Sequence, residues 1–199
     1  MKVKKILKTI GMLAVIGVSG TITYHLIKKY RNRNEAEENG LEADKPKTIL
    51  LLGGLDNRNG DLSITEQVEL LERGVSNSLN VEGFRYNDKS GIINRINNSE
   101  KEMYVVLFSA GCSKSKDVAQ ELINKEYNLN YMFIVEPYGK SSTTSQSVKD
   151  AVSMGVPSKN VMVGNSKSTG LDIIDNATST PSCSPTHWCS LIEIGEVIK

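Results

Sequence analysis

The chain has 199 residues, with 24 Lys or Arg against 23 Asp or Glu, so its formal net charge at pH 7 is only +1. This balance gives no basis for nucleic-acid binding, and we expect none. The 39% of hydrophobic residues excludes a disordered chain and is enough for one folded domain with an additional segment.

Residues 1–29 are predicted to form an N-terminal membrane anchor. A basic start, MKVKKILK, leads into an uncharged stretch of roughly 19 residues (9–27), which can just span a bilayer as a helix. A cleaved signal peptide is the alternative, but no clear cleavage site follows and the stretch is longer than usual. Lys and Arg flank the stretch on both sides, so the side of the membrane stays open. Residues 30–47 are rich in charge and are predicted to be a linker.

The remaining part, 48–199, alternates apolar runs with amphipathic segments. The segments predicted to be strands are 48–54, 81–88, 103–111, 131–139 and 160–165. The predicted helices between them are 63–75, 90–98, 115–126 and 142–155, the first opened by a capping box of Ser63 and Glu66. Residues 166–186 are predicted to be a loop, and the last segment fits a helix or a strand. The alternation predicts an α/β fold: a mostly parallel, doubly wound sheet of about five or six strands with helices on both faces.

Ligands of such sheets bind at the carboxyl ends of the strands, so the stretch that follows the most apolar run is the first to consider. There Gly111-Cys112-Ser113-Lys114-Ser115 fits the pattern small-x-nucleophile-x-small. The turn that exposes a nucleophile between strand and helix is so tight that only small residues fit two positions to either side. Ser113 is therefore the candidate nucleophile, at a strained backbone position.

With this turn, the chain resembles the α/β-hydrolase family over most of residues 48–199, with Ser115 in place of the last glycine of G-x-S-x-G. The glycine pair that ends the first apolar run is similar to the oxyanion loop of lipases and esterases. The resemblance implies that the backbone N–H groups of Leu55 and Lys114 stabilise the oxyanion. It also implies that His187, the domain's single histidine, is the general base.

The acid of the triad has three candidates. Asp172 comes first and Asp175 third, because both follow the fifth predicted strand, where the family places its acid. Glu136 is second, since some lipases carry the acid after the preceding strand.

These features predict a membrane-anchored serine hydrolase of esterase or lipase type, which cleaves a small acyl-containing ester, thioester or amide through an acyl-enzyme, without a cofactor or a metal. One alternative is a catalytically inactive binding or assembly module, tethered to a membrane or particle surface and facing an unknown protein partner. Another is a thiol enzyme that uses Cys112. Cys183 and Cys189 either form a disulfide in an oxidising compartment or remain free thiols.

Overall fold

The computed structural model describes residues 45–56, 61–137, 142–163, 178–179 and 187–198. The predicted anchor and most of the predicted linker lie outside these residues. Residues 46–199 form one compact unit. In the described ranges, no helix has the length and apolar character needed to cross a membrane.

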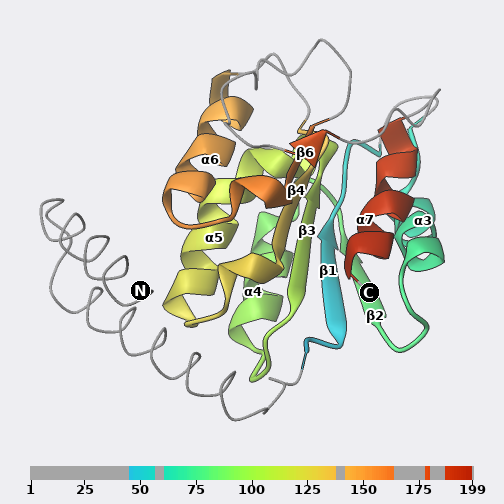
Figure 1. The fold of residues 1–199 in the computed structure, drawn as a ribbon, viewed down its shortest axis with the longest axis horizontal. Helices are drawn as coiled ribbons and strands as arrows, with labels where there is room; N and C mark the ends of the chain where they lie inside the picture. The colour runs from blue at the N-terminus through green and yellow to red at the C-terminus, as the bar shows by residue number, and fades with distance from the viewer. Residues whose placement is uncertain (1–44, 57–60, 138–141, 164–177, 180–186, 199) are drawn as a thin grey trace, which may run out of the picture. The chain divides into compact units, whose positions relative to one another are not determined.

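A parallel sheet forms the centre of the domain (Figure 1). Its strands are β1 (Thr48–Leu52), β2 (Asn80–Phe84), β3 (Tyr104–Phe108), β4 (Met132–Val135), β5 (Val161–Val163) and the two-residue β6 (Thr178–Ser179). They lie in the order β2-β1-β3-β4-β5-β6, and each neighbouring pair is parallel. The predicted α/β fold with a parallel sheet is confirmed. β6 was not expected, because the stretch around it is rich in Ser, Thr and Pro.

Helices cover both faces of this sheet, as expected (Figure 1). They are α3 (Ile64–Gly74), α4 (Lys89–Asn97), α5 (Ser115–Asn124), α6 (Ser142–Ser153) and α7 (Ser190–Ile198). α4, α5 and α6 pack on one face, and α3 and α7 pack on the other. The last segment, which fitted a helix or a strand in the sequence, is the helix α7.

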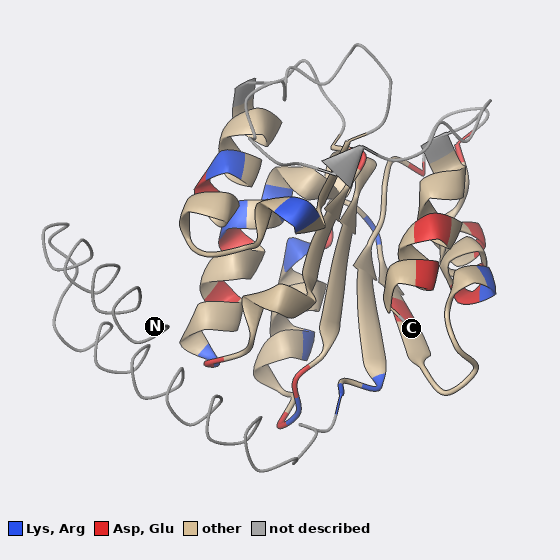
Figure 2. Ribbon diagram, in the orientation of Figure 1, with Lys and Arg blue, Asp and Glu red and all other residues tan. Residues whose placement is uncertain are grey.

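The two faces of the sheet contribute to two separate cores, because side chains alternate along a strand. In β1, Leu50 and Leu52 point to the core under α4, α5 and α6, whereas Ile49 and Leu51 point to the core under α3 and α7. β1, β3, β4 and β5 contain no charged residue, and Figure 2 shows the charges mainly on the helices and connections. Each Leu or Ile that is removed from water in this way contributes about 1.5–3 kcal/mol.

The predicted capping box at the start of α3 is confirmed. The Ser63 side chain accepts a hydrogen bond from the Glu66 N–H, and the Glu66 side chain accepts one from the Ser63 N–H. At its other end, α3 crosses α7 with the backbones of Gly74 and Gly195 in contact, since a Cβ atom on Gly74 would lie 2.1 Å from the Ile192 carbonyl oxygen. The capping box and the close crossing fix α3 at both ends.

The strand order places a topological switch point between β1 and β3. The chain leaves β1 toward α3 on one face of the sheet and leaves β3 toward α5 on the other. At such a switch point the two loops diverge, and doubly wound proteins bind ligands there. The segments after β1 and β3 are therefore the place to look for a functional site.

Candidate active site

Ser109 follows β3 directly and has an unusual backbone conformation. Its φ is 51°, in the left-handed region that side chains other than glycine rarely adopt. Within the described ranges, three non-glycine residues share a positive φ: Ser109, Glu126 and Glu136. Glu126 has an ordinary explanation, because it follows the C-cap of α5 at Lys125, where the next N–H, of Tyr127, donates to the Leu122 carbonyl. Ser109 and Glu136 instead follow adjacent central strands, so their conformation points to a functional site.

The turn after Ser109 is tight. A Cβ atom on Gly111 would lie 2.4 Å from the carbonyl oxygen of Leu52 and 2.7 Å from that of Gly53, so only glycine fits two positions after Ser109. This is the steric requirement of a nucleophile elbow. Two positions before Ser109 the pattern departs from G-x-S-x-G, because Leu107 is there and is fully buried in the core.

Ser113 does not have the strained backbone that was predicted for the residue at the elbow. β3 ends at Phe108 and not at residue 111, and a 3-10 helix, η1 (Ser109–Lys114), follows at once. Ser113 lies inside η1, partly exposed and without a positive φ. The uncharged Ser-Ala-Gly after the strand resembled its continuation. Lys114 is the last residue of η1, and Ala110 is the residue that follows the strained Ser109.

The loop after β1 contacts Ser109. A Cβ atom on Gly54 would lie 3.0 Å from Cβ and 3.3 Å from Oγ of Ser109, so the loop backbone lies against this side chain. The Gly54 N–H donates to Gln67 Oε1 at 2.8 Å, and Leu55 provides the next N–H along the loop. After β3, Ala110 lies in the first turn of η1, where N–H groups have no partner within the helix. These two N–H groups, of Leu55 and Ala110, are the candidates for an oxyanion hole.

Glu136, the second candidate acid, lies beside Ser109. Phe108 pairs with Val135, so the residues that follow them, Ser109 and Glu136, leave neighbouring strands at the same level. Glu136 has a φ of 48° and is only 8% exposed, and its Oε1 accepts a hydrogen bond from Ser190 Oγ at 3.1 Å. The other two candidate acids, Asp172 and Asp175, lie outside the described residues.

His187 begins the short 3-10 helix η4 (His187–Cys189). For His187 itself the structure describes only the backbone. Its sequence neighbours bring this backbone to the site. The Trp188 ring packs on Phe108 with 5.4 Å between ring centroids, and Ser190 binds Glu136. The predicted base is therefore adjacent in sequence to Trp188, which contacts Phe108. It is three residues from Ser190, which binds the candidate acid Glu136.

Cys112 is a buried, neutral thiol. Its Sγ donates to the carbonyl oxygens of Leu107 at 3.1 Å and Val135 at 3.5 Å, and burial raises its pKa well above the ordinary value. A thiolate nucleophile is disfavoured in such surroundings, which argues against a thiol enzyme at Cys112. Cys189 is disulfide-bonded, and Cys183, the remaining cysteine of the sequence, lies outside the described residues.

The start of α7 carries a second carboxyl group near Glu136. Burial raises the pKa of Glu193, and the negative charges of Glu136 and Glu196 raise it further. The negative charge of these carboxyl groups favours a neighbouring cation.

Two features of the site were missed in the sequence. The signal for Ser109 was present, since Gly111 stands two residues after it. No local pattern marked Gln67, because a glutamine on a helix is ordinary until the fold brings a loop to it. Among the described residues, no group of three or more His, Cys, Asp or Glu could hold a metal ion. Comparisons with protein-family models, with curated proteins and with solved structures found no match.

Proposed function

We propose that this protein is a serine hydrolase in which Ser109 is the nucleophile, His187 the general base and Glu136 the acid that orients it. The observation that carries the proposal is the left-handed backbone of Ser109 at the β1/β3 switch point, with Gly54 packed against its side chain and Gly111 packed against the end of β1. An isolated strand-to-helix junction needs no such conformation, which costs about 1–3 kcal/mol.

In the proposed reaction, Ser109 Oγ attacks the carbonyl carbon of an ester, thioester or amide while His187 takes the hydroxyl proton. The negative charge on the carbonyl oxygen is stabilised by the N–H groups of Leu55 and Ala110, and Glu136 balances the charge of the imidazolium. The tetrahedral intermediate expels the leaving group, which receives the proton from His187, and an acyl-Ser109 ester remains. Water, deprotonated by His187, then attacks the acyl carbon; the acyl–Ser109 bond breaks, Ser109 Oγ takes the proton back from His187, and the acid is released. An oxyanion donor typically accounts for about 10²–10³ in kcat.

The proposal includes attachment to a membrane through residues 1–29. The disulfide at Cys189 supports an oxidising surrounding for the domain, since disulfides persist in secreted and periplasmic compartments and are rare in the cytosol. We therefore propose that the domain lies on the extracytoplasmic side and acts on acyl groups exposed there.

The test is covalent labelling of the full-length protein in detergent with diisopropyl fluorophosphate, a small reagent suited to a serine that is 3% exposed. We expect one adduct, on Ser109. Ser109→Ala should abolish it, whereas Ser113→Ala, a matched control in the same turn, should keep it. His187→Ala and Glu136→Gln should slow labelling. An adduct on Ser113, or none on a folded protein, contradicts the proposal, and the second outcome favours the inactive binding module.

A further inference from the structure

We propose that Gln67 is a positioning residue, which holds the loop between β1 and α3 at the distance from Ser109 that the Leu55 N–H needs to bind an oxyanion. The inference rests on the proposed function. It extends that function by naming a side chain that touches neither the substrate nor the nucleophile and yet fixes half of the oxyanion hole.

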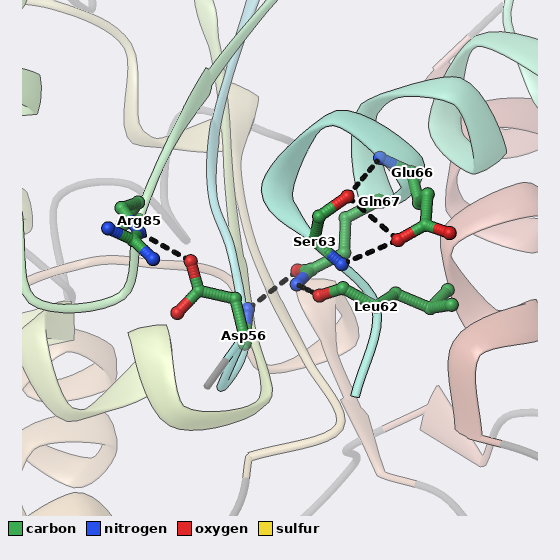
Figure 3. A network of polar contacts seen from close by, with 7 residues as sticks. Asp56, Leu62, Ser63, Glu66, Gln67 and Arg85 are labelled. Atoms are coloured by element: carbon green, nitrogen blue, oxygen red, sulfur yellow. Dashed lines mark hydrogen bonds and ion pairs between the residues drawn. The ribbon is translucent and has the colours of Figure 1, made fainter. Parts of the chain in front are cut away.

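One side-chain amide joins both ends of this loop. Gln67 Oε1 accepts a hydrogen bond from the Gly54 N–H at 2.8 Å, and Gln67 Nε2 donates to the Leu62 carbonyl oxygen at 2.8 Å (Figure 3). The side chain is completely buried. Both polar atoms of the amide therefore serve the loop, one at its start and the other at its end.

The clamp is itself anchored. Gln67 lies in the first turn of α3, and its N–H donates to the Ser63 carbonyl at 3.0 Å. The capping box of Ser63 and Glu66 lies beside it (Figure 3). The fit is close on the loop side as well, because a Cβ atom on Gly53 would lie 2.5 Å from Gln67 Oε1. Neither the helix start nor the loop can shift without disturbing these contacts.

The clamp reaches the nucleophile through Gly54. The backbone of Gly54 is bound to Gln67 through its N–H, and a Cβ atom placed on it would lie 3.3 Å from Ser109 Oγ. By occupying the Gly54 N–H, Gln67 also leaves the N–H of Leu55 as the next donor of the loop. Without the amide oxygen, the Gly54 N–H is buried without a partner, and the loop must move to satisfy it. A displacement of about 1 Å at such a donor can cost 10²-fold in rate.

The experiment uses the full-length protein and three variants. Gln67→Leu removes both hydrogen bonds at similar volume. Gln67→Glu keeps an oxygen for the Gly54 N–H but, when ionised, has no donor for Leu62. Asn160→Leu is the matched control: the Asn160 side chain is buried and donates to two backbone carbonyls, of Asn130 and Met132, at the amino end of the sheet, the edge opposite the site. The measurements are kcat and KM for p-nitrophenyl acetate, Ki for phenylboronic acid, and urea unfolding.

We expect Gln67→Leu to lower kcat about 10²-fold with KM within threefold, and to raise Ki for the boronate, which mimics the tetrahedral intermediate, by a similar factor. Gln67→Glu should lose less, because the contact to Gly54 remains. Asn160→Leu should lower the urea midpoint and leave kcat and Ki within threefold of the wild type. If Gln67→Leu does not fold, the comparison of Gln67→Glu with Asn160→Leu decides: a loss of kcat confined to Gln67→Glu supports the clamp.

The inference is overturned if folded Gln67→Leu keeps the wild-type kcat, or if Gln67→Leu and Asn160→Leu lose kcat equally. In either case, labelling of Ser109 by diisopropyl fluorophosphate would still support the proposed function. Absence of labelling in the wild type overturns both.

Discussion

Replacing Ser109 by glycine should give a more stable protein than replacing it by alanine, although both variants should be inactive. Both substitutions remove the same hydroxyl, so the difference between them isolates the Cβ atom at a φ of 51°. A left-handed conformation costs a residue with a Cβ atom about 1–2 kcal/mol. The greater freedom of glycine in the unfolded chain offsets about 0.5–1 kcal/mol of this. We therefore expect Ser109→Gly to exceed Ser109→Ala by about 0.5–1 kcal/mol in the free energy of unfolding.

The assay is urea unfolding followed by tryptophan fluorescence. Trp188 is the single tryptophan of the chain and packs on Phe108, the residue before Ser109, so it reports on unfolding at the site. Two matched pairs complete the design. Glu126, with a φ of 57°, should show the same preference for glycine over alanine, whereas Ser113, which has no positive φ, should prefer alanine by about 0.5–1 kcal/mol. Equal stability of the two Ser109 variants, together with a glycine preference at Ser113, would refute the assignment of the strained elbow to Ser109.

Three further predictions concern the elements around the site. Because burial raises the pKa of Glu193, the folded state holds the carboxyl proton more tightly than the unfolded chain does, and the free energy of unfolding falls as the pH rises above the ordinary pKa of 4.5. Glu193→Gln should therefore be more stable than the wild type at pH 7 and equally stable below pH 4.5. Urea titrations at both pH values measure this difference. Gly74→Ala should lose about 1–3 kcal/mol in the same titration, since its Cβ atom would lie 2.1 Å from the Ile192 carbonyl oxygen, and an unchanged midpoint would contradict the close crossing of α3 and α7. Reduction with dithiothreitol should lower kcat for p-nitrophenyl acetate about tenfold, because the disulfide at Cys189 holds the chain two residues after His187 in place. Undiminished activity of the reduced protein would argue against a role of the disulfide in positioning His187.

The sequence alone determined the fold class. Apolar runs such as 103–108 are buried on both faces and contain no charge, and the segments between them have one apolar side, so a parallel sheet covered by helices on both faces was the arrangement that buried both kinds of surface. The capping box at Ser63 and Glu66 was also readable, because its two partners are three residues apart and bind each other without help from the rest of the chain.

The position of the candidate nucleophile was decided by the tertiary structure. Uncharged Ser, Ala and Gly after Phe108 can continue a strand or begin a turn, and the glycine at position 111 is compatible with both. The choice depends on where pairing with the neighbouring strands ends and on the carbonyl groups of Leu52 and Gly53, which exclude any side chain at Gly111. A strained backbone is held in place by contacts from distant parts of the chain, so its location follows from packing.

The same reason applies to the other groups of the site. Glu136 was one of three candidate acids in the sequence, and the pairing of β3 with β4 is what brings it beside Ser109. Gln67 carried no signal, because its two partners, Gly54 and Leu62, meet it only when the loop closes over the start of α3. Periodicity and capping are properties of neighbours in the chain, whereas a catalytic arrangement joins residues that are neighbours only in space.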